Sequence, residues 1–272
     1  MPPRCNWRSP NYQPLRTLTA QKTWCTCNRF PAMVAPPSPH LTVIIPVLNE
    51  APTLPKTLVG LQGIESLEVI VVDGGSQDHT VAIAQALGAR VITAAVGRAK
   101  QMNAGAAIAT GEILIFLHGD TQLPTGFATM IPAALAVSGA IAGAFALQID
   151  APQPAFRWIE AGVNWRSRWL QRPYGDQALF LNASVFRACG GFPDLPIMED
   201  FEFVRQLARR GEIVIVPTPV VTSARRWQRL GIWQTTLINQ GIVVAYLLGV
   251  PCHSLAHWYR RSRGFPISPP PG

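Results

Sequence analysis

The feature that most constrains the fold is a regular alternation of short apolar runs with helical segments, which begins at residue 41. Leu41 to Val47, Leu67 to Val72 and Ile113 to Leu117 are rich in β-branched residues, as is typical of strands buried on both faces. Segments of about ten residues with helical spacing separate these runs, which favours parallel strands joined by helical crossovers. The sequence therefore predicts an α/β fold with a mostly parallel sheet flanked by helices.

The second half of the chain predicts a mixed arrangement of elements. Strands are expected at residues 140–149, 178–182 and 213–216, and helices at residues 154–170 and 199–210. A charge-free, mostly apolar stretch follows at residues 230–250.

Polar side chains follow the predicted parallel strands at their carboxyl ends, which is where such sheets bind ligands. Asn49 and Glu50 follow the strand at residues 41–47, Asp73 follows the strand at residues 67–72, and Asp120 follows the strand at residues 113–117. No G-x-G-x-x-G follows the first strand, which argues against a dinucleotide site. Asp73 is placed to accept hydrogen bonds from a base or ribose, and Asp120 suits Mg²⁺ or Mn²⁺, which prefer oxygen ligands.

A second group of acids lies further along the chain. Glu199 and Asp200 open a predicted helix, where they serve either as ordinary partners of the helix dipole or as a general base for a hydroxyl nucleophile. Asp176 is a candidate of the same kind. Arg98 and Lys100, at a helix start after Gly97, are placed to face phosphates.

The net charge of +8 comes from the two ends of the chain, because residues 41–250 hold equal numbers of basic and acidic residues. This distribution favours contact with an anionic surface such as a membrane and argues against a nucleic-acid partner. Five scattered cysteines form no disulfide framework, so a reducing, cytoplasmic compartment is expected. His253 and His257 are interpreted as surface residues.

Six motifs, taken in order, resemble glycosyltransferases of family 2, in the subgroup associated with radical-SAM and selenoprotein-type domains, with carotenoid-ester glycosyltransferases as a neighbouring possibility. They are LTVIIPVLNE (41–50), VIVVDGGSQDHT (69–80), LHGDT (117–121), GGF (190–192), MED (198–200) and SARRW (223–227). The resemblance implies a bacterial enzyme with an A-type glycosyltransferase fold, which is Rossmann-like, a nucleotide-diphosphate sugar donor and a divalent metal, Mg²⁺ or Mn²⁺.

The resemblance also implies roles for single residues. Nucleotide binding is implied for Pro46, Asn49, Glu50 and Asp73. Asp120, the last acid of the family's D-x-D motif, would hold the metal and the diphosphate. Asp200 would be the base of an inverting displacement, with Glu199 beside it, and the acceptor would meet Asp176 and Trp227.

Arg226 and Trp227 match the family's R-W pair, which contacts diphosphate and acceptor. The sequence departs from the family at His118, which replaces the first acid of D-x-D and leaves the identity of the metal open. Two other functions also stay open: a catalytically inactive, membrane-associated binding protein, and a nucleotidyltransferase.

The expected domain organisation has four parts. Residues 1–38 are expected to be a disordered, basic, Pro-rich tail with Met33 as an alternative start, and residues 39–228 the glycosyltransferase domain. Residues 229–260 are expected to be an apolar helical segment, either at a membrane interface or closing the core, and residues 261–272 a disordered tail. The acceptor is unknown; a lipid-linked acceptor would suit a peripheral location on the inner face of the cell membrane.

Overall fold

Strand β1 (Leu41–Val47) forms the centre of a parallel half-sheet and is buried along its whole length. It pairs in parallel with β2 (Leu67–Asp73) and β4 (Ile113–Phe116), and β3 (Arg90–Thr93) extends the sheet beyond β2. The predicted parallel strands are confirmed. The computed structural model describes residues 40–262, except for the side chains of Arg226, Arg229 and Leu230.

The other half of the sheet is mixed, as expected. β7 (Leu179–Asn182) is antiparallel to β4, β6 (Ala140–Asp150) is antiparallel to β7, and β8 (Glu212–Ser223) runs parallel to β6. The short β5 (Thr121–Gln122) closes the edge, so the strand order is β3-β2-β1-β4-β7-β6-β8-β5.

Strand β8 is longer than the four residues predicted for it. Pro217 and Pro219 argue against a strand in the sequence because proline cannot donate to a ladder. The register between β6 and β8 shifts next to these prolines, between Phe145 and Ala146, and the pairing then continues to Ser223.

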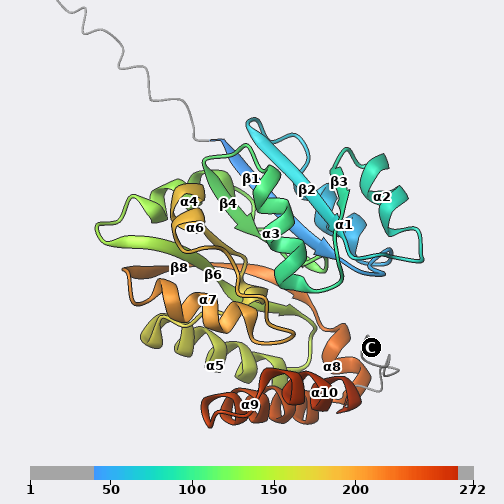
Figure 1. Ribbon diagram of the computed structural model, residues 1–272, viewed down its shortest axis with the longest axis vertical. Helices are drawn as coiled ribbons and strands as arrows, with labels where there is room; N and C mark the ends of the chain where they lie inside the picture. The colour runs from blue at the N-terminus through green and yellow to red at the C-terminus, as the bar shows by residue number, and fades with distance from the viewer. Residues whose placement is uncertain (1–39, 263–272) are drawn as a thin grey trace, which may run out of the picture. The chain divides into compact units, whose positions relative to one another are not determined.

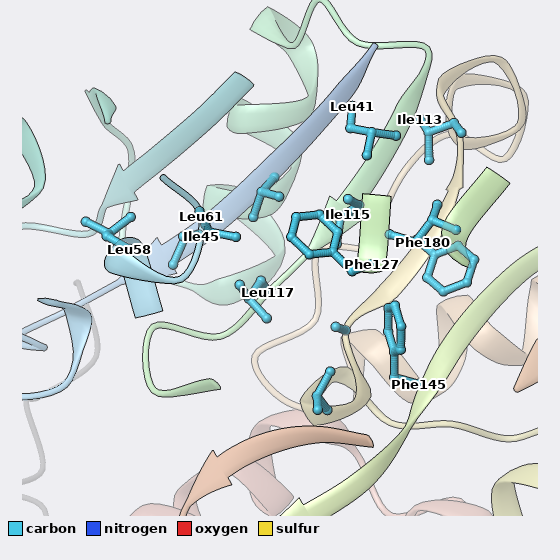
Figure 2. Close-up of a cluster of buried hydrophobic side chains, with 14 of the residues drawn as sticks. Leu41, Ile45, Leu58, Leu61, Ile113, Ile115, Leu117, Phe127, Phe145 and Phe180 are labelled. Carbon is cyan, nitrogen blue, oxygen red and sulfur yellow. The ribbon is translucent and has the colours of Figure 1, made fainter. Parts of the chain in front are cut away.

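Helices cover both faces of the sheet because alternate residues of β1 point to opposite sides. Val43 and Ile45 pack in a core with α1 (Leu54–Val59), α2 (Thr80–Ala86) and α4 (Phe127–Leu135). Ile44 packs in a second core with α3 (Arg98–Ile108), α6 (Ala183–Ala188) and α7 (Glu199–Leu207). Figure 2 shows part of the first core, in which the rings of Phe145 and Phe180 lie 5.4 Å apart.

The remaining helices gather near the start of α7, at the end of the fold away from β3 (Figure 1). They are α5 (Pro154–Leu170), α8 (Arg225–Leu230), α9 (Ile232–Leu247) and α10 (Cys252–Ser262). Ile242 of α9 and Leu255 of α10 share a small core with Met198 and Phe201 at the start of α7. Within residues 40–262, no helix combines the length and apolar character needed to cross a bilayer.

Candidate active site

The loops that follow β1 and β2 are tied together by hydrogen bonds. Asn49 adopts the left-handed region (φ 55°), donates its N–H to Ser76 Oγ at 2.9 Å and accepts the N–H of Gln77 on Oδ1 at 2.8 Å. The N–H of Glu50 donates to Thr80 Oγ1 at 2.8 Å. Pro46 lies inside β1, opposite Val72, beyond the last residue that pairs with β4. The two strand ends therefore form one rigid rim.

Asp73 is buried at the end of β2, and its carboxylate shapes the turn that follows. Oδ2 accepts the N–H of Gly75 at 2.9 Å, and both carboxylate oxygens accept the N–H of Ser76 at 3.1 Å. A carboxylate offers about four acceptor positions, so these bonds leave capacity for a further donor. Gln101 of α3 braces the same rim by donating to the carbonyls of Val47 and Val72, both at 2.8 Å.

A guanidinium group links the ends of β1 and β4. Arg225 Nη2 lies 2.6 Å from Glu50 Oε2 and 4.0 Å from Asp120 Oδ2. The N–H of Ser223 donates to the Asp120 carbonyl at 3.1 Å, which brings the start of α8 to this position. Arg225 is not among the residues predicted from the sequence, because the motif match pointed to the adjacent Arg226. The side chain of Arg226 lies outside the described part of the structure.

The donor atoms near Asp120 suit a weakly held divalent cation. Among the described residues, no group of three or more His, Cys, Asp or Glu side chains is arranged to hold a metal. Asp120 supplies a buried carboxylate, 6% exposed, and His118 stands where the family has its first acid. Mg²⁺ keeps several waters and binds through one or two carboxylates together with substrate phosphates, so a single carboxylate fits a cation that arrives with its substrate.

Asp200 lies in the first turn of α7 and is held by two backbone donors. Its Oδ2 accepts the N–H of Gly175 at 2.8 Å and its Oδ1 accepts the N–H of Phe201 at 2.8 Å. A Cβ atom added to Gly175 would lie 3.0 Å from Asp200 Oδ2 and 3.2 Å from His118 Nε2. Gly175 thus lets His118 and Asp200 approach the same point, and its sequence context gave no signal for this role.

Glu199 is buried near this point, where it lines a small pocket with His118, Gly175 and Asp200, and it pairs with Arg98. Its Oε1 lies 2.8 Å from Arg98 Nε, and its side chain is almost fully buried. Burial raises the pKa of Glu199, and the nearby charge of Asp200 raises it further, while Arg98 opposes both effects. The charge of Glu199 raises the pKa of Arg98, so the guanidinium stays cationic.

A cavity of about 150 Å³ lies beside Asp200. Five of the predicted site residues line it: Arg98, His118, Asp176, Asp200 and Trp227. Much of its remaining wall is apolar, contributed by residues such as Ile159, Val163, Met198, Ile242 and Val243. Helix α9 supplies several of the lining residues, although the sequence motifs do not place it in the site.

The other predicted site residues whose side chains the structure describes lie outside this cavity. Asn49, Glu50, Asp73 and Asp120 belong to the rim at the strand ends, and Lys100 Nζ lies 3.7 Å from the exposed Asp194. His118 connects the two regions, since it lines the cavity and stands two residues before Asp120. The site therefore has two adjoining parts: the strand-end rim and the cavity beside Asp200.

Solved structures similar to this chain share its fold. A mannosyltransferase from Pyrobaculum calidifontis in complex with GDP-Man and Mn²⁺ has a TM-score of 0.57 and 22% identity, covering 82% of this chain and 70% of that one. Glucosyl-3-phosphoglycerate synthase from Mycobacterium tuberculosis, in complex with Mn²⁺, UDP and phosphoglyceric acid, has a TM-score of 0.53 and 17% identity, covering 85% and 80%. S. aureus TarS in complex with UDP has a TM-score of 0.55 and 19% identity, covering 68% and 60%.

Curated relatives match over a shorter part of the chain. A PGL/p-HBAD biosynthesis glycosyltransferase of Mycobacterium bovis is 39% identical over 95 residues, which is 32% of this chain and 37% of the relative. A 4,4'-diaponeurosporenoate glycosyltransferase of Staphylococcus haemolyticus is 36% identical over 92 residues, which is 30% of this chain and 24% of the relative. The matched region thus spans less than two-fifths of the length of either relative.

The fold, with its polar rim at the ends of parallel strands, is the fold of A-type glycosyltransferases. The model of the family described as glycosyl transferase family 2 matches residues 42–192. The chain belongs to this family, as the sequence motifs predicted.

Proposed function

We propose that the protein transfers a sugar from a nucleotide-diphosphate sugar to a hydroxyl or carboxyl group of an acceptor with a large apolar part, with inversion at the anomeric carbon. The observation that carries the proposal is the position of Asp200, whose carboxylate is fixed by two backbone donors at the edge of a partly apolar cavity. The relatives named for PGL/p-HBAD and for diaponeurosporenoate support an acceptor of this kind.

In this mechanism, the acceptor binds in the cavity with its reacting O–H directed at Asp200. The acceptor oxygen attacks the anomeric carbon from the face opposite the diphosphate, and Asp200 takes its proton as the new bond forms. The bond from the anomeric carbon to the diphosphate oxygen breaks, and its electron pair leaves with the nucleoside diphosphate. A single displacement of this kind inverts the configuration, and it leaves the proton on Asp200.

Charged residues stabilise the departing diphosphate in this proposal. Arg98 lines the cavity, and its cationic form is supported by Glu199. Asp120 would hold a divalent cation, Mg²⁺ or Mn²⁺, which supplies positive charge for the diphosphate when it is bound. The rim formed by Asn49, Glu50 and Asp73 would hold the nucleoside.

The indole of Trp227 supports the placement of the acceptor. Trp227 is nine-tenths buried, lines the cavity and packs edge-on against Phe156 at 5.9 Å. Its Nε1 atom has no hydrogen-bond partner among the described residues. A buried N–H without a partner is costly, and an acceptor or sugar oxygen in the cavity would satisfy it.

The test is a screen of UDP-, GDP- and dTDP-sugars for release of nucleoside diphosphate by the purified full-length chain, with and without Mn²⁺. Asp200→Asn is expected to lower the turnover of the active donor by about 10²–10⁴-fold, while calorimetry shows unchanged nucleotide binding. The matched control is Asp150→Asn, which removes an exposed carboxylate paired with Lys56. Nucleotide binding without turnover of any donor, with or without added lipid acceptors, would instead identify an inactive binding protein.

A further inference from the structure

The helices beside the cavity carry an unusual number of exposed tryptophans. Five indoles on α5, α9 and α10 are more than half exposed: Trp158 (77%), Trp165 (60%), Trp169 (75%), Trp233 (65%) and Trp258 (52%). A single exposed apolar side chain is ordinary on a protein surface, but a group of this size indicates an interaction site.

The three tryptophans of α5 form one stripe. Trp158, Trp165 and Trp169 are spaced by seven and four residues, so at 3.6 residues per turn they point to the same side of the helix. The residues that α5 buries, among them Phe156 and Ser167, face the protein instead. The stripe is therefore turned outward and contributes nothing to the core.

Helix α9 has an outward apolar face of the same kind. Trp233, Leu237, Val244 and Leu247 are all more than half exposed and recur at helical spacing, while Thr235 and Ile242 are buried on the other side. Ile159 and Val163 of α5 and Ile242 and Val243 of α9 line the cavity that contains Asp200. Both helices thus line the same cavity with residues that lie outside these apolar faces, and α10 packs against α9 (Figure 1).

The charge around these faces has one sign. Arg157 and Arg168 on α5 and Arg260 and Arg261 on α10 are exposed cations. The sole acid in α5, α9 and α10 is Glu160, which is buried and paired with Arg157 at 2.9 Å. A second copy of the chain would bring like charges together, whereas indoles combined with arginines suit the headgroup region of an anionic bilayer.

We propose that the outward faces of α5, α9 and α10, called here the tryptophan face, dock on a membrane that contains anionic phospholipid. The docked helices are then the ones that line the cavity, so an acceptor with an apolar part in the membrane lies close to the site of Asp200. This benefit for catalysis rests on the proposed function, but the docking itself is independent of it. The tryptophan face extends the expected membrane contact of residues 229–260 to α5.

The experiment measures sedimentation of the full-length protein with vesicles of phosphatidylcholine alone or mixed with phosphatidylglycerol, without donor or acceptor. The wild-type protein is expected to bind the mixed vesicles more tightly, with a blue shift of tryptophan emission. The triple variant W158S/W165S/W169S is expected to bind at least about tenfold more weakly, because binding scales with the apolar area inserted. R260E/R261E is expected to lose about fivefold or more per arginine on mixed vesicles only.

Controls separate this surface from general stickiness. The variant V59S/V96S/V137S removes three exposed valines on other parts of the fold, and R187E/R209E reverses two arginines near α6 and α7; both should bind like the wild type. All variants are made in the full chain. Residues 1–38 are basic, so any contribution that they make to vesicle binding is the same in every variant and does not affect the comparison. Circular dichroism and thermal unfolding confirm that each variant folds.

Two results would overturn the proposal. One is equal vesicle binding by the wild type and the tryptophan variant. The other is a wild-type dimer in light scattering that the tryptophan variant converts to monomer, which would make the surface an interface between copies. Donor turnover is measured separately, so turnover without vesicle binding rejects the tryptophan face alone, and vesicle binding without turnover rejects the enzyme alone.

Discussion

The Nε atom of Arg98 lies 2.8 Å from Oε1 of Glu199, and this ion pair joins the first turn of α3 to the first turn of α7. The guanidinium lines the cavity, whereas the carboxylate is 2% exposed. Glu199 therefore holds Arg98 beside Asp200, and its own side chain stays out of the cavity. Of the two adjacent acids, Asp200 is the one placed to meet a substrate.

Glu199 is expected to make the protein less stable as the pH rises. Because burial raises the pKa of Glu199 in the folded state, the folded protein binds more protons than the unfolded chain above pH 4.5. This contribution to the free energy of unfolding is present in full below pH 4.5 and is lost as the pH rises through the folded-state pKa. Glu199→Gln removes this dependence, which urea unfolding at a series of pH values would measure.

Glu202, on the same helix, is a control of opposite sign. Burial acts to raise its pKa, but hydrogen bonds from Arg205 and Tyr246 outweigh burial and lower the pKa. Above pH 4.5, the wild type should therefore be more stable than Glu202→Gln, and this difference in the free energy of unfolding is lost as the pH falls.

The prediction for Glu199 has a clear contrary outcome. If the stability of the wild type relative to Glu199→Gln increased with rising pH, Arg98 would be the dominant influence on the pKa of Glu199.

Gly175→Ala is expected to impair turnover without unfolding the protein. The added methyl group would lie 3.0 Å from Asp200 Oδ2 and 3.2 Å from His118 Nε2, so it displaces the proposed base. A displacement of about 1 Å at a reacting group costs roughly 10²-fold in rate. Gly60→Ala is the matched control, because its new Cβ meets nothing closer than 3.6 Å, and unchanged turnover in Gly175→Ala would count against Asp200 as the base.

Arg225→Met is expected to strengthen binding of Mn²⁺ in the presence of a nucleoside diphosphate by about tenfold. The variant removes the cation that lies 2.6 Å from Glu50 and 4.0 Å from Asp120, so both carboxylates become available to the metal. Calorimetry or Mn²⁺ electron paramagnetic resonance measures the change without turnover. Arg225→Lys keeps the charge and should bind Mn²⁺ like the wild type; weaker binding by Arg225→Met would place the metal away from Asp120.

Gly143→Ala is expected to lower the free energy of unfolding by roughly 1–3 kcal/mol, or to prevent folding, because it overpacks the core. The new Cβ would lie 2.3 Å from a ring atom of Phe180, across the pairing of β6 with β7. Gly162→Ala in α5 meets no atom within 4 Å and should be neutral or stabilising. Equal unfolding midpoints for the two variants would contradict this prediction, because they would show that Phe180 can move to make room for the added methyl group.

The parallel half of the fold follows from the sequence alone. The apolar runs that become β1, β2 and β4 are local patterns that can be recognised in the sequence. Asn49, Asp73 and Asp120 stand at the ends of these runs. Because parallel strands end at one edge of a sheet, these side chains could be predicted to lie at the same edge. The position of Asp200 at the start of α7 was equally readable. By contrast, helix α4 is not among the predicted elements; Pro132 lies within it, and proline normally interrupts a helix.

Only the tertiary structure decided which side chains meet. Nothing in the sequence distinguishes Arg225 from Arg226, yet the path from β8 to α8 sets Arg225 against Glu50 and Asp120. The same holds for the approach of Gly175 to Asp200 and for the position of α9 beside the cavity. Hydrophobic periodicity indicates which face of a helix or strand is buried. It does not indicate which distant element covers that face, because the hydrophobic effect is non-directional and any apolar surface can cover it.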